Sequence, residues 1–144
     1  MLFNSGLTDI LHPISVHFPV ALTLTGLFLA VIYLIREQNP MLNTCSKVVL
    51  FLAAVSAWVA IITSSFTPHL TGEAARIMNI HHLYAFWFTF TVTAAAVIYL
   101  FIWLYRKPLP KWVGWLGFVF YALAGVFISF TGYYGGYIVY NVLL

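Results

Sequence analysis

Charge is the scarcest property of this sequence. Only 6% of its 144 residues are Asp, Glu, Lys or Arg, whereas 63% are hydrophobic and 19% are aromatic. A soluble domain carries about 25% charged residues, so this chain has too few charged residues to form the water-facing surface of a soluble protein. The few charges leave four uncharged stretches, each longer than the ~20 residues with which an α-helix crosses the hydrocarbon core of a bilayer. These stretches are residues 10–35, 48–72, 77–105 and 112–144.

Cysteine and catalytic motifs are equally scarce. The single Cys45 excludes a disulfide within the chain and any Cys-x-x-Cys metal or c-haem attachment site. Ser64 and Ser65 have no nucleophile motif around them, so an electron carrier or complex subunit is expected more than an enzyme. The net charge of +3 comes from loop residues and does not indicate a nucleic-acid partner.

The uncharged stretches predict an all-α fold, an integral membrane four-helix bundle in which residues 1–144 form one domain. The helices are expected at about 14–35, 47–67, 80–105 and 112–134, and the second loop could hold a short interfacial helix. Small residues on two of these helices would let backbones approach closely, although such residues are also simply common in membrane helices. They are Ala53, Ala54, Ala57, Ala60, Gly114, Gly117 and Gly125.

Lysine and arginine are distributed unevenly between the two sides of the predicted bundle. Five of the six lie in the first and third loops or beside them: Arg36, Lys47, Arg106, Lys107 and Lys111. Only Arg76 lies on the opposite side. Because Lys and Arg accumulate in cytoplasmic loops, both termini and the second loop are expected on the outer side of the membrane.

Histidines gather at the outer ends of the first three predicted helices. They are His12, His17, His69, His81 and His82. A histidine at membrane depth is costly unless it faces the bundle interior or water, so this placement suggests a site. His69 is expected to be a solvated loop residue.

The stretch "LHPISVHFPV" places two histidines and two prolines at the beginning of the first predicted helix. Pro13 and Pro19 are expected in first turns, where a missing N–H costs little, and His17 is expected to face inward. His81 and His82 are adjacent, so only one of them can face the same partner as His17.

The chemistry that fits this pattern best is haem binding, because haem needs one or two imidazoles from facing helices and an apolar slot. We expect His17 and either His81 or His82 to ligate the iron, with His12 supporting them. Arg76 would meet the propionates, and a sharp turn at Gly135–Gly136 would bring Tyr137 and Tyr140 near the histidines. A zinc or copper site is an alternative, but no residue spacing specifies one.

The motifs resemble those of a known family. "HPISVHFPVAL", "HHLYAFW" and the terminal "GGYIVY" are similar to signatures of the bacterial four-helix membrane proteins called the domain of unknown function 2231 family, and the resemblance covers nearly the whole chain. Such domains often occur fused or adjacent to c-type cytochromes. The resemblance therefore implies a multi-pass protein of the bacterial cytoplasmic (inner) membrane. It further implies b-type haem, respiratory electron transfer, and a c-type cytochrome or quinone-linked component as partner.

Three functions remain open at this point. The first is a b-type haem-binding, cytochrome-like electron-transfer protein or subunit in the lipid bilayer. The second is a non-redox structural or assembly subunit of a larger membrane complex, in which the signatures only pack helix ends. The third is transport of a metal or small solute, although no acidic relay or broken mid-helix pair is visible.

Overall fold

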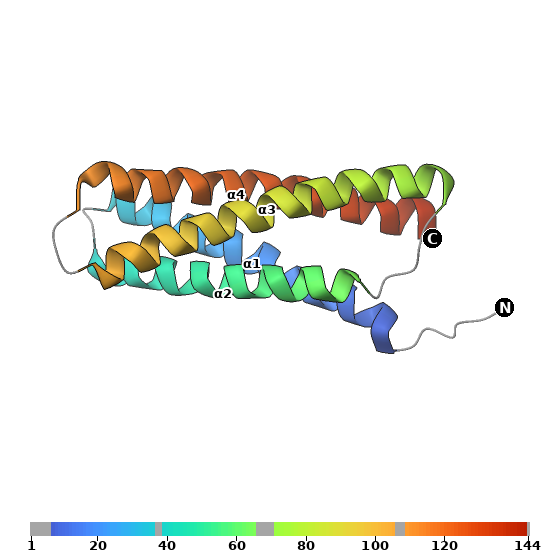
Figure 1. The fold of residues 1–144 in the computed structure, drawn as a ribbon, viewed down its shortest axis with the longest axis horizontal. Coiled ribbons are helices and arrows are strands. Elements are labelled where there is room, and N and C mark those ends of the chain that lie inside the picture. Colours follow the sequence, from blue (N-terminus) through green and yellow to red (C-terminus); the bar gives the residue numbers. More distant parts are fainter. Residues whose placement is uncertain (1–6, 37–38, 66–70, 106–108, 144) are drawn as a thin grey trace.

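Four long helices make up the part of the protein that the structure describes. The computed structural model describes residues 7–36, 39–65, 71–105 and 109–143 (Figure 1). The elements are α1 (Leu7–Ile35), α2 (Pro40–Ser64), α3 (Gly72–Leu104), α4 (Lys111–Ile138) and a short π-helix, η1 (Val139–Leu143). All four α-helices are long and apolar enough to cross a membrane. The predicted all-α architecture with four candidate membrane spans is confirmed.

Each helix begins earlier in the chain than predicted. The Asn39 side chain accepts a hydrogen bond from the Met41 N–H at 2.9 Å, and Pro40 occupies the first helical position. Cys45 precedes the predicted start of the second helix at residue 47 and was therefore expected in the first loop, which is wrong, because it lies half-buried in the second turn of α2. Gly72 has a φ of 65°, which favours glycine, and it begins α3. Residues 72–80 therefore belong to α3 and do not form a separate interfacial helix.

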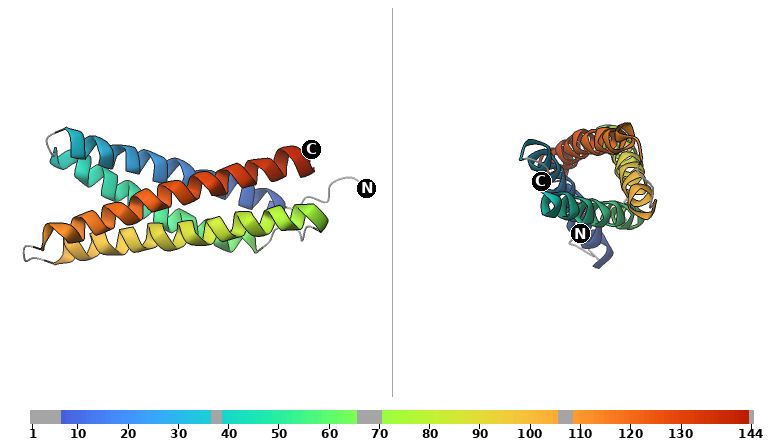
Figure 2. Two further views of the ribbon diagram at one scale, coloured as in Figure 1. Left: turned by 90° about the horizontal axis from the view of Figure 1, so that it is seen from above. Right: turned by 90° about the vertical axis from the view of Figure 1, so that its left-hand side faces the viewer.

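The helices form two antiparallel pairs. α1 packs along α2 and α3 packs along α4, whereas contacts between the pairs, α1 with α4 and α2 with α3, are fewer. The two pairs cross each other at an angle, and an end-on view places all four helices around a common centre (Figure 2). The beginnings of α1 and α3 lie at the same end as the ends of α2 and α4 (Figure 1). We call this the terminal end of the bundle.

Small residues fill the interior while large apolar side chains face outward. Ala53, Ala57, Ala95 and Ala124 are at most 1% exposed, whereas Trp103 is 77% exposed. This distribution suits a lipid-facing surface, because close backbone approach drives helix packing in membranes. The predicted contacts are confirmed for the four alanines of α2 and for Gly117 and Gly125. Gly114 differs, because a side chain there would meet open space.

Tyr121, the largest fully buried side chain among the described residues, joins the two helix pairs. Its hydroxyl on α4 occupies the space that a Cβ would need at Gly26 of α1. The same glycine accepts a hydrogen bond at its carbonyl from the Ser46 hydroxyl of α2, at 3.0 Å. The Tyr121 hydroxyl itself has no hydrogen-bond partner among the described residues. Gly26 thus provides the notch in which three helices meet.

Candidate functional site

His12 connects α1 to the last turns of α2. Its Nδ1 lies 3.1 Å from the Ala60 carbonyl oxygen and 3.2 Å from the Thr63 hydroxyl. The carbonyl can only accept, so His12 donates its Nδ1 proton to it and Nε2 is the unprotonated nitrogen of the neutral ring. Ser15, one turn further along α1, shares a hydrogen bond of 2.7 Å with the same Thr63 hydroxyl. These contacts fix the orientation of the His12 ring.

His81 makes the equivalent connection between α3 and α4. Its Nδ1 lies 3.0 Å from the Thr131 carbonyl oxygen, and its side chain is only 8% exposed. By the same reasoning Nδ1 donates its proton and Nε2 is unprotonated in the neutral ring. Gly135 packs closely against the His81 ring, because a Cβ at that position would lie 3.2 Å from Cε1 and 3.3 Å from Nδ1 of His81. We call the position that Thr131 and Gly135 form around this ring the His81 seat.

Three histidines share this region of the terminal end. The ring centroids of His81 and His82 are 5.8 Å apart. His12, His81 and His82 lie close enough to one another for charges on their rings to interact. His81 is buried and His82 exposed, so the structure identifies His81 as the inward member of the pair. Within the described ranges, no group of three or more His, Cys, Asp or Glu side chains is arranged to hold a metal ion.

The predicted orientation of His17 is wrong. Its side chain is exposed on the outside of α1, with Nδ1 2.6 Å from the Pro13 carbonyl oxygen. The expected first-turn positions of Pro13 and Pro19 are also wrong, because α1 begins at Leu7 and both prolines lie inside the helix. Pro19 is buried. A helix advances about 100° per residue, which turns His17 away from the face that Pro19 buries.

The predicted turn at Gly135–Gly136 is also wrong, because α4 continues through both residues to Ile138. Tyr137 and Tyr140 consequently stay on the surface of the helical segments, 41% and 74% exposed. Arg76 is exposed on α3 before His81. His69 lies outside the described residues. The structure therefore brings together His12, His81 and His82, and leaves His17 and Tyr140 outside this group.

The residues that orient the histidines were missed by the sequence reasoning. On α1 the inward face contains small or polar residues at helical spacing, and this spacing was a usable signal. The face consists of His12, Ser15, Pro19, Thr23, Gly26 and Ala30. By contrast, the Thr131 and Ala60 partners offer backbone carbonyls, which carry no residue-specific signal.

The arrangement is suited to ligation through Nε2. In metal sites, a ligating histidine usually donates its other ring N–H to a carbonyl or carboxylate, which fixes the ring and its tautomer. His12 and His81 both have this arrangement, one on each helix pair. The site therefore offers two oriented imidazoles as ligands.

Comparison with known proteins is consistent with this membrane architecture. Residues 8–143 match the family described as predicted membrane protein (DUF2231). Searches of the curated proteins and of the solved structures returned no match. Because the match covers nearly the whole sequence, the chain belongs to the DUF2231 family of predicted membrane proteins, embedded in the lipid bilayer with four candidate spans.

Proposed function

We propose that this protein binds a b-type haem between His12 and His81 and carries single electrons within the membrane. The observation that carries the proposal is the pair of Nδ1–carbonyl hydrogen bonds, to Ala60 and to Thr131. Each leaves Nε2 as the ligating nitrogen of a ring whose orientation is fixed. His12 thus replaces His17 in the ligand pair expected from the sequence.

The residues present fit haem in the chemistry of their donor set. Two neutral imidazoles are a common axial pair, and bound haem would supply one-electron exchange at its iron. His81 lies in the seat formed by Thr131 and Gly135, so it is held independently of any ligand. The exposed Arg76 carries the positive charge that a propionate requires. His12 and His81 belong to different helix pairs, so bound haem would also stabilise the bundle.

The orientation in the membrane is part of the same proposal. The Lys/Arg bias of the loops supports an orientation in which the terminal end is on the outer face of a bacterial cytoplasmic membrane. His12 and His81 would then hold the haem near that face, within reach of a c-type cytochrome or a quinone-linked component as electron-transfer partner. The protein would then be a carrier or a subunit of a larger respiratory complex.

The test is a visible spectrum of the protein purified in mild detergent from haem-replete cells, first oxidised and then reduced with dithionite. The proposal predicts a Soret band and sharp α and β bands after reduction. A colourless preparation that also fails to take up added haemin would contradict it.

The same hydrogen bonds favour a second function, that of a structural subunit of a membrane complex. His12 ties α1 to α2 and His81 ties α3 to α4, and such ties stabilise helix pairs without any cofactor. The two proposals differ at Nε2, which only haem binding requires. Under the structural proposal, Asn in place of His12 or His81 should preserve stability if its amide replaces the Nδ1 donor, and no haem should be found.

A further inference from the structure

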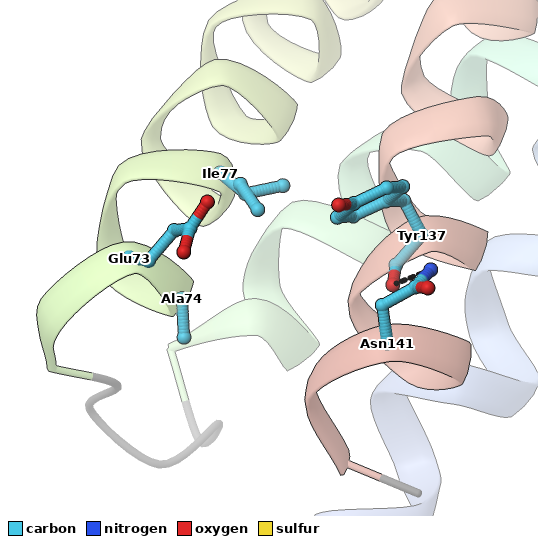
Figure 3. A pocket seen from close by; sticks show the side chains of 5 residues that line it. All are labelled: Glu73, Ala74, Ile77, Tyr137 and Asn141. Atoms are coloured by element: carbon cyan, nitrogen blue, oxygen red, sulfur yellow. Dashed lines mark hydrogen bonds between the residues drawn. The ribbon is translucent and has the colours of Figure 1, made fainter.

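A surface hollow separate from the histidines lies at the terminal end. It lies between the first turns of α3 and the end of α4 and encloses about 300 Å³ (Figure 3). Its lining combines two apolar and three polar residues: Glu73, Ala74, Ile77, Tyr137 and Asn141. Glu73 and Tyr137 point toward each other from the two helices (Figure 3).

The polar groups of this hollow favour a cationic hydrogen-bond donor. The Glu73 carboxylate only accepts hydrogen bonds. The Tyr137 ring offers an electron-rich face that attracts cations. Asn141 uses its Nδ2 on the Tyr137 carbonyl at 3.1 Å, which leaves its Oδ1 as an acceptor. Among the described residues no lysine, arginine or histidine forms an ion pair with Glu73, so its charge is not neutralised within this part of the protein.

The depth of the hollow in the membrane identifies the source of such a cation. The candidate spans of α3 and α4 begin at Gly72 and end at Asn141, respectively, so the hollow is at the outer limit of both spans, where lipid headgroups are expected. Ala74 and Ile77 give it an apolar wall beside the exposed surface of the helices. A lipid can place its headgroup in this hollow while its acyl chains stay along the bundle.

We propose that this hollow binds the primary ammonium headgroup of phosphatidylethanolamine, with Glu73 as its acceptor and Tyr137 against its side. Phosphatidylcholine has the same charge but carries no N–H on its headgroup, so it cannot donate a hydrogen bond to the carboxylate. The site should therefore distinguish the two lipids. It goes beyond the proposed electron transfer and involves neither His12 nor His81.

The test measures lipid binding to the full-length protein in detergent micelles by native mass spectrometry. Phosphatidylethanolamine and phosphatidylcholine with identical acyl chains compete in the same sample, and soluble ethanolamine is added in a separate one. We expect a preference for phosphatidylethanolamine that falls about tenfold in Glu73→Gln, because one charge-assisted hydrogen bond is lost. The control Tyr133→Phe changes a residue of α4 that does not line the hollow, so this variant should keep the preference for phosphatidylethanolamine.

Glu73 also lies in the first turn of α3, where a carboxylate stabilises the helix by itself. That effect is the same in both lipids, so it cancels from the measured preference. Equal binding of the two lipids to the wild type, or an undiminished preference in Glu73→Gln, would overturn the proposal. Tighter binding of ethanolamine than of phosphatidylethanolamine would overturn the assignment to a lipid and identify a soluble amine as the ligand.

Discussion

Gly135 should be intolerant of even one added methyl group, whereas its neighbour Gly136 should accept it. A Cβ at residue 135 would lie 3.2 Å from Cε1 of His81, while a Cβ at residue 136 would meet nothing within 4 Å. His81 cannot move away cheaply, because it is buried and bonded to Thr131. Alanine is favoured over glycine in a helix by about 1 kcal/mol at either position, so comparing the two variants cancels that gain.

The crowding at His81 sets the size of the effect. Adding a methylene to a well-packed site costs about 1–3 kcal/mol, and we expect Gly135→Ala to be less stable than Gly136→Ala by about this amount. The free energy of unfolding would be measured by denaturant titration in mixed micelles, followed by circular dichroism. Adding His81→Ala to both variants should remove most of the difference, because the crowded ring is then gone. Equal stability of Gly135→Ala and Gly136→Ala would refute the close packing of His81 against Gly135.

Three further predictions concern other parts of the bundle. Gly26→Ala should lower the free energy of unfolding by about 1–3 kcal/mol. The same substitution made in a Tyr121→Phe background should cost much less, because this background lacks the hydroxyl that fills the notch. An equal cost in both backgrounds would mean that the hydroxyl is not the cause. Cys45→Ser should leave the yield and any haem spectrum unchanged, since the side chain is half-buried in α2 at the end remote from the histidines; loss of haem would place the site elsewhere. Reporter fusions after Lys107 and Leu144 should report cytoplasmic and external locations, respectively, and the reverse result would move the histidines to the cytoplasmic face.

The membrane spans could be predicted from the sequence because they depend on amino-acid composition alone. Long intervals without charge leave few alternatives to helices that cross a bilayer. The helix beginnings did not follow as well, because polar residues such as Asn39 and Thr71 resemble loop residues when a neighbouring helix is not considered. In the structure these two residues are the N-cap residues of α2 and α3.

The candidate site was predicted in position but not in detail. Its location at one end of the bundle followed from the spacing of His12, His81 and His82 relative to the spans. The orientation of His17 did not, because it depends on which face of α1 packs against the other helices, and the residues of that face, such as Pro19 and Thr23, were not recognised. Gly135 was interpreted as a turn residue, but within a membrane helix glycine more often allows close packing, here against His81.

The central claim, that His12 and His81 hold a b-type haem, is tested most directly by electron paramagnetic resonance of the oxidised protein, with His12→Ala, His81→Ala and His17→Ala compared at equal protein concentration. We predict a low-spin ferric signal in the wild type and in His17→Ala, because His17 lies outside the bundle. The signal should be lost or become high-spin in His12→Ala and in His81→Ala, because each removes one axial nitrogen. A low-spin signal that survives unchanged in either of these variants, or disappears only in His17→Ala, would contradict the ligand assignment.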